Sequence, residues 1–216
     1  LTVSRISVEF ARSDGNIAYA LAYEYPGTTL HYSRIYKSTN GGQSWTNSFD
    51  SDRNGIDFLA NVAQSQGYYN NVIAVHPTNP NIVLAGGVYM VRTDNGGNTW
   101  SQIGNEVHVD HHAMMFDPAN PNTFYSGNDG GMYRSENAGQ SYDKKSRGLA
   151  ITQFYAMAVD QNKDSLNYGG TQDNGTVTSS SAVYGNIMGG DGFFVVVDHT
   201  NSNIYYAENP NGENIT

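Results

Sequence analysis

Four aspartates of this sequence have side chains and surroundings suited to catalysis: Asp110, Asp129, Asp173 and Asp191. Two carboxyl groups can hydrolyse a glycosidic bond when they flank it at about 5–5.5 Å for retention or about 6.5–9.5 Å for inversion. We therefore take these four as the candidate catalytic residues. Asp is also favoured in glycine-rich turns, so a structural turn role is the alternative for Asp129, Asp173 and Asp191.

Three histidines surround one of these aspartates, at His108, His111 and His112. Histidine and aspartate side chains are suitable metal ligands, but their spacing matches no established zinc signature, and neighbouring side chains on a strand point to opposite faces. We predict no metal and no cofactor, and expect a hydrogen-bonded cluster. A bound metal is the alternative.

Tyrosines are frequent, with 16 in 216 residues, and several lie in connections between predicted strands. An aromatic ring beside carboxylates suits a carbohydrate, because the ring stacks on the apolar sugar face and the oxygens accept from hydroxyls. Ordinary strand packing is the alternative reading. We predict these ligand-binding residues: His108, His111, His112, Asp129, Asp173, Asp191, Tyr25, Tyr68 and Tyr69.

A repeat of about forty residues must position these side chains, and such a period is typical of solenoids and propellers. Four turn-like segments, each between two apolar runs, begin at residues 76, 117, 160 and 198. Short alternating or apolar runs bounded by Gly, Asn and Pro predict β-strands throughout. The sequence thus predicts a hairpin that is repeated four times.

A second repeated segment is a polar turn ending in an aromatic residue, at residues 38–45, 93–100 and 135–142. It resembles the Asp-box, or BNR repeat, with Asn in place of the family's usual Asp. The resemblance implies a tight hairpin with local side-chain bonds, a glycine with positive φ and an aromatic packed into the blade. The residues assigned to this structural role are Ser38, Asn40, Gly42, Trp45, Thr93, Asn95, Gly97, Trp100, Ser135, Asn137, Gly139 and Tyr142.

Together the two series predict an all-β fold, a β-propeller of four-stranded antiparallel blades with the last blade incomplete. We expect one partial propeller over residues 1–216, with blades at about 5–50, 69–103, 112–145, 153–184 and 192–216. Propellers have four to eight blades closed on themselves, so we expect this one to be part of a larger propeller. The expected partners include the remaining blades of the same protein or a partner chain.

A more particular resemblance rests on four segments, at residues 109–113, 127–131, 169–175 and 189–192. They are similar to large secreted bacterial proteins related to the sortilin-type and xyloglucanase-type propellers, many of them described as glycosyl hydrolases. The resemblance implies a secreted or cell-surface protein.

The candidate residues are expected on one face. In a four-stranded antiparallel blade, the connection into the blade and its second turn share one end, where the histidines and the four aspartates fall. A formal net charge of −9 with 11 Lys and Arg argues against a nucleic-acid partner, and no stretch is long enough to span a membrane. We expect a recognition or structural module that binds a carbohydrate or protein ligand at this face. The alternative is a glycoside hydrolase that acts on a polysaccharide.

Overall fold

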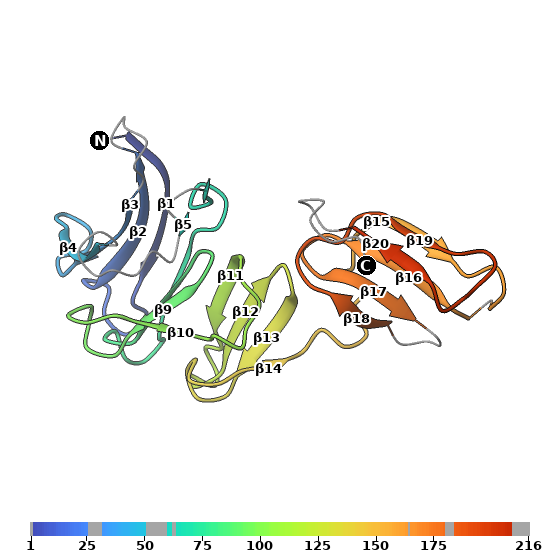
Figure 1. Ribbon diagram of the computed structural model, residues 1–216. Coiled ribbons are helices and arrows are strands. Elements are labelled where there is room, and N and C mark those ends of the chain that lie inside the picture. Colours follow the sequence, from blue (N-terminus) through green and yellow to red (C-terminus); the bar gives the residue numbers. More distant parts are fainter. Residues whose placement is uncertain are drawn as a thin grey trace. The chain divides into compact units, whose positions relative to one another are not determined.

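The computed structural model describes residues 2–25, 32–50, 60–61, 64–163, 165–179 and 184–208. All regular elements of these residues are β-strands (Figure 1). The described part of the chain contains no helix that is long and apolar enough to cross a bilayer. Two compact units divide the chain, Leu1–Arg147 and Gly148–Thr216.

The first unit contains three four-stranded antiparallel sheets, which we call blades 1 to 3. Their strands are listed here in chain order: β1 (Thr2–Phe10), β2 (Ala18–Tyr25), β3 (Tyr32–Ser38) and β4 (Thr46–Asp50); β7 (Val72–Val75), β8 (Val83–Gly86), β9 (Met90–Thr93) and β10 (Ser101–Ile103); β11 (His111–Phe116), β12 (Phe124–Asn128), β13 (Gly131–Ser135) and β14 (Asp143–Lys144). A short hairpin of β5 (Ala60–Asn61) and β6 (Gln64–Ser65) precedes blade 2. The first strand of blade 2, β7, packs against both β1 and β11, the first strands of its neighbours.

The second unit contains blade 4, another four-stranded sheet, and blade 5, a pair of strands. Blade 4 is built from β15 (Phe154–Val159), β16 (Asn167–Thr171), β17 (Gly175–Ser179) and β18 (Tyr184–Met188), and blade 5 from β19 (Val195–Val197) and β20 (Tyr205–Ala207). These sheets confirm the predicted all-β class with four-stranded antiparallel blades and a shorter fifth.

Two of the predicted blade limits are corrected. Blade 1 begins at Thr2, and blade 4 ends at Met188, because Tyr184 opens its outer strand and does not close it. The part of the predicted fifth blade from residue 209 onward lies outside the described residues. That all blades form one propeller domain stays a prediction.

The apolar core of the first unit lies between its sheets. Residues of blade 1 such as Leu21 and Phe49 pack with Val83 and Val91 of blade 2, whose Leu84 and Met90 pack in turn with Phe124 of blade 3. All four residues of β8 and of β9 are buried, because blade 2 has a neighbour on each side. Full burial of such a side chain stabilises the fold by about 1.5–3 kcal/mol. In the second unit a smaller core joins Tyr168 of blade 4 to Val195 and Ala207 of blade 5.

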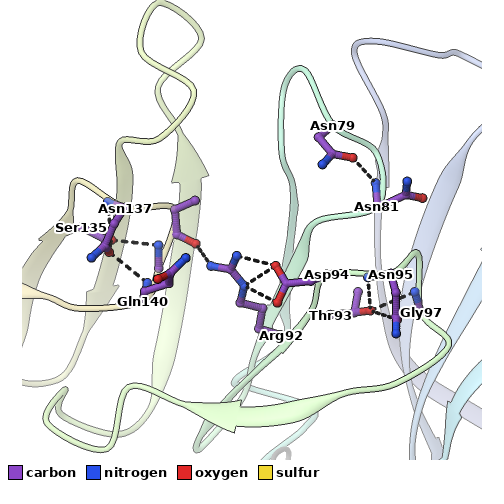
Figure 2. A network of polar contacts seen from close by, with 12 residues as sticks. Asn79, Asn81, Arg92, Thr93, Asp94, Asn95, Gly97, Ser135, Asn137 and Gln140 are labelled. Atoms are coloured by element: carbon purple, nitrogen blue, oxygen red, sulfur yellow. Dashed lines mark hydrogen bonds and ion pairs between the residues drawn. The ribbon is translucent and has the colours of Figure 1, made fainter.

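The three polar turns close on themselves through their own short side chains. In blade 1 the Ser38 hydroxyl accepts from the Gly42 amide at 2.9 Å, and the Asn40 side-chain oxygen accepts from the Ser44 amide at 2.9 Å. Gly42 has a φ of +85°, which a residue with a Cβ rarely adopts. The same bonds recur around Thr93 and Asn95 in blade 2 (Figure 2) and around Ser135 and Asn137 in blade 3.

The polar turns lie at the same blade end as the first turn of each blade, as predicted. The amides of Gly41, Gly96 and Ala138, each the fourth residue of its polar turn, donate to backbone carbonyls of the first turn at 2.9, 2.9 and 2.7 Å. The connections into each blade and the second turns therefore lie at the opposite end of each blade.

The packing predicted for the aromatic residue of the polar turn holds for Trp100 and is wrong for Trp45. Trp100 is 8% exposed because its ring lies 6.1 Å from that of Phe49 on the preceding blade. Trp45 is 37% exposed. Blade 1 is the first described blade, and no earlier sheet among the described residues covers this side.

Candidate ligand-binding site

The connection into blade 3 is held along the second turn of blade 2. The Asp110 amide donates to the Val88 carbonyl at 3.1 Å, and the His111 amide donates to the Gly87 carbonyl at 2.8 Å. Asp110 has a φ of +65°, in the left-handed region that is unfavourable for most residues. This segment therefore keeps a fixed conformation at the end of blades 2 and 3 opposite the polar turns.

A β-bulge at the start of β11 places His112 outside the regular pairing, between His111 and Ala113. Bulges redirect side chains at the ends of sheets. The His112 Nε2 lies 2.7 Å from an Asp129 oxygen in the turn between β12 and β13. The Tyr69 and His112 rings meet edge to face, with centroids 4.8 Å apart and planes 68° apart. A histidine, a carboxylate and an exposed tyrosine thus lie together, all three partly accessible to solvent.

His111 points in the opposite direction, into the protein. Its side chain is 1% exposed, and its Nδ1 lies 2.8 Å from the Ser126 hydroxyl. Burial, followed by the charges of His112 and His108, lowers the pKa of His111 to about 4. The ring is therefore neutral at neutral pH, and the geometry gives it a structural role. We do not include it among the proposed ligand contacts.

Asp110 is joined to blade 2 through a side chain that sequence reasoning did not select. The Asn70 amide group donates to the Asp110 carboxylate and to the Gln66 side-chain oxygen. Burial is the largest cause that raises the pKa of Asp110, and the charge of Asp129 raises it further, while His108 and Asn70 oppose the change. Asp110 and Asp129 are therefore electrostatically coupled carboxylates at one end of blades 2 and 3.

Two adjacent asparagines lie directly before β7, and Asn70 contacts Asp110 of this cluster. Asn70 and Asn71 are 0% and 2% exposed. The Asn70 oxygen and both polar atoms of the Asn71 side chain are buried without a hydrogen-bond partner. An unpaired buried amide costs about 1–3 kcal/mol, so it is not explained by stability alone.

His108 is held against the turn that carries Asp129. A Cβ placed on Gly130 would lie 2.3 Å from the Cβ of His108, so only glycine permits this approach. The first unit thus brings together His108, Asp110, His112, Asp129 and Tyr69, which we call the rim cluster. Tyr68 is 62% exposed beside it.

The second unit also brings two of the predicted aspartates together. The Asp173 amide donates to an Asp191 carboxylate oxygen at 2.7 Å, and Asp173 has a φ of +58° in the turn between β16 and β17. Gly175 and Asp191 form an isolated parallel bridge, and the Gly192 amide donates to the Thr171 carbonyl at 2.9 Å. These backbone contacts fix Asp191 against the turn of Asp173.

An aromatic pair accompanies these carboxylates. Tyr155 and Phe193 are stacked, with ring centroids 5.1 Å apart and planes 18° apart. Tyr155 lies at a bulge between Phe154 and Ala156, the counterpart of His112 in blade 3. Desolvation is the first cause that raises the pKa of Tyr155, and the charges of Asp191 and Asp173 follow. In blades 3 and 4 alike, therefore, a residue at a β-bulge of the first strand lies near the aspartate of the second turn.

Sequence reasoning placed the aspartates and histidines at the predicted blade ends but missed Asn70, Asn71, Tyr155 and Phe193. The signal for the asparagines was their position directly before a buried strand. The side chain of Tyr25 lies outside the described residues. Within the described ranges, no group of three or more His, Cys, Asp or Glu side chains could hold a metal ion.

Among the solved structures that resemble this chain are two GH74 proteins. One is the GH74 enzyme of Niastella koreensis, with 22% identity and a TM-score of 0.53, over 95% of this chain and 33% of that one. The other is the GH74 xyloglucanase of Xanthomonas campestris, with 13% identity and a TM-score of 0.52, over 95% of this chain and 43% of that one. The chain spans less than half the length of either. No protein-family model matches it, and no curated protein matches it.

At these identities the likeness concerns the fold alone. Together with the repeated four-stranded sheets it defines the class: this is an all-β protein with the β-propeller fold.

Proposed function

We propose that this protein is a secreted β-propeller recognition or structural module that binds a carbohydrate or protein ligand at the rim cluster. One observation carries the proposal: the exposed Tyr69 ring lies against His112, which pairs with Asp129, and the neighbouring Asn70 and Asn71 have buried side-chain atoms without a hydrogen-bond partner. Polar groups that converge beside an aromatic ring are typical of ligand sites.

The chemistry of the cluster suits a neutral or cationic ligand with hydroxyl or amide groups. Tyr68 and Tyr69, which are 62% and 58% exposed, offer ring faces for stacking. Asp110 and Asp129 offer acceptor oxygens, and the fixed backbone of the connection holds Asp110 in place. The net charge of −9 disfavours a polyanionic ligand.

A glycoside hydrolase is the second candidate, favoured by the coupling between Asp110 and Asp129. A carboxyl group whose surroundings raise its pKa is suited to an acid role, and burial, followed by the charge of Asp129, raises the pKa of Asp110. Two of the similar solved structures are GH74 enzymes, one of them a xyloglucanase, so xyloglucan is the first polysaccharide to test.

The deciding experiment compares Asp129→Asn with Glu136→Gln. Both variants remove one negative charge from blade 3, but Glu136 lies in the polar turn at the opposite end and its side chain is 68% exposed. Binding to arrays of oligosaccharides and peptides is measured first, and reducing ends released from xyloglucan second.

We expect Asp129→Asn to weaken binding at least about tenfold, equivalent to about 1.4 kcal/mol, and Glu136→Gln to leave it unchanged. Release of reducing ends by the wild type, lost in Asp129→Asn, would assign the hydrolase. Equal binding by both variants would refute a site at the rim cluster.

A further inference from the structure

At both contacts between consecutive blades of the first unit, a cationic side chain of one blade donates to a backbone carbonyl of the next blade. The Lys37 ammonium of blade 1 donates to the Gly96 carbonyl of blade 2 at 2.8 Å. The Arg92 guanidinium of blade 2 donates to the Ala138 carbonyl of blade 3. Figure 2 shows Arg92 between the Asp94 carboxylate and the polar turn that contains Asn137.

These contacts occupy equivalent positions of the repeat. Lys37 directly precedes Ser38, and Arg92 directly precedes Thr93, the hydroxyl residues that open their polar turns. Gly96 and Ala138 are each the fourth residue of theirs. In both contacts, therefore, the earlier blade supplies a cationic side chain, and the later blade supplies a backbone carbonyl of its polar turn.

The aromatic residue of the later blade follows the same direction. Trp100 of blade 2 donates from its indole nitrogen to the Ser48 hydroxyl of blade 1 at 3.3 Å, and that hydroxyl donates to the Gly97 carbonyl at 2.8 Å. Tyr142 of blade 3 reaches Met90 of blade 2. The polar turns of blades 2 and 3, with their aromatic residues, thus pack on the preceding blade.

Blade 1 has the same groups that blades 2 and 3 contribute to their contact with the preceding blade. Its polar turn has Gly41 at the fourth position and Trp45 at the aromatic position. Among the described residues, no Lys or Arg side chain donates to the Gly41 carbonyl as Lys37 does to that of Gly96.

The first strand of blade 1, β1, has one face toward blade 2. The side chains of Arg5, Ser7 and Glu9 face blade 2, where they bond to the backbone of Tyr69, Asn71 and Val75.

The alternate side chains, on the opposite face of β1, are apolar and exposed. Ile6, Val8 and Phe10 are 52%, 50% and 47% exposed. A Cβ on Gly42 would lie 3.6 Å from Phe10 and 3.7 Å from Trp45, so both side chains lie beside this turn. We call Ile6, Val8, Phe10 and Trp45 the apolar strip. A contiguous exposed strip of this kind marks an interaction surface.

We propose that the apolar strip and the Gly41 carbonyl dock a further blade of this repeat, belonging to the same polypeptide. That blade carries Lys or Arg directly before the hydroxyl residue of its polar turn. Its outer strand presents a hydroxyl and an aromatic side chain to Trp45, as Ser48 and Phe49 do to Trp100. The same polypeptide is the source because both described interfaces join blades of one chain.

Neither blade 3 nor blade 4 of the same chain fits as the blade that docks on the apolar strip. Blade 4 has Thr178 before Ser179, and so lacks the cation. Blade 3 has it in Arg134, whose Nε is buried without a partner, but blade 3 is held on the far side of blade 2 from the apolar strip. A second copy of the chain, offering its Arg134, is therefore the competing occupant.

Hydroxyl-radical footprinting with mass spectrometry tests the proposal. Oxidation of Trp45 and Trp100 is measured in the 216-residue chain and in the whole polypeptide that its gene encodes. In the 216-residue chain Trp45 should react about four to five times faster than Trp100, in proportion to exposed fractions of 37% and 8%. In the whole polypeptide we expect Trp45 to slow to the rate of Trp100, which serves as the internal control.

Two results would overturn the proposal. One is a Trp45 that stays reactive in the whole polypeptide. The other is protection of Trp45 in the 216-residue chain that grows with concentration and disappears in Arg134→Gln, because a second copy would then be the occupant.

Discussion

Acid should destabilise the first unit through His111. The folded protein lowers the pKa of this histidine from its ordinary 6.5 to about 4, because the ring is buried beside His112 and His108. The unfolded chain therefore binds a proton at pH values where the folded chain does not. The stability contributed by the neutral ring is present at neutral pH and is lost progressively as the pH falls from about 6.5 toward 4.

The magnitude follows from the two pKa values. At pH 5 the unfolded histidine is almost fully protonated and the folded one is almost fully neutral. The resulting loss relative to pH 7 is about 2 kcal/mol, at about 1.4 kcal/mol for each unit of pH in that range. The full loss, reached below pH 4, is about 3 kcal/mol.

Urea unfolding at pH 7 and pH 5 measures this loss, followed by tryptophan fluorescence. Trp45 and Trp100 are the two tryptophans of the sequence, and both belong to the same unit as His111. His111→Asn keeps a polar atom for Ser126 and removes the titration, while His199→Asn changes an exposed histidine of the other unit. We expect the wild type and His199→Asn to lose about 2 kcal/mol more than His111→Asn does. Equal losses in all three proteins would refute the reasoning.

Two further predictions concern packing. Trp100→Ala should lower the free energy of unfolding by about 3–5 kcal/mol, as for other buried large-to-small changes, and Trp45→Ala by less than half as much in the 216-residue chain, both measured in urea. Equal costs would mean that the two rings are equally buried. Gly130→Ala should cost about 1–3 kcal/mol, because its Cβ would collide with His108, whereas Gly15→Ala, with open space around it, should change stability by less than about 0.5 kcal/mol. A neutral Gly130→Ala would show that His108 is free to move.

The fold could be predicted from the sequence because its information is local. The polar turns fix their own conformation through neighbouring side chains, as Ser38 and Asn40 do, so three copies of the pattern located three hairpins. The end of the blade at which Asp129 and His112 lie followed from strand order alone. Their direct contact at 2.7 Å needed one more fact, the bulge at the start of β11, which no residue pattern marks.

The burial of individual side chains could not be predicted, because it depends on which neighbouring elements cover them. Asn70 and Asn71 look like turn residues in the sequence, yet both are buried directly before β7. Trp45 and Trp100 occupy equivalent positions of the repeat and differ in burial because only Trp100 has a described blade behind it. Periodicity predicts a residue's place in its blade, but its exposure is decided by the neighbouring blade.

The acceptor of the contact between blades is a backbone carbonyl, and this has an evolutionary consequence. The residue at the fourth position can change from Gly96 to Ala138 without loss of the acceptor, since every amino acid has the same carbonyl. A gene that duplicates, deletes or exchanges blades of this repeat would therefore preserve the joint between them, provided that each incoming blade keeps one lysine or arginine before its hydroxyl residue.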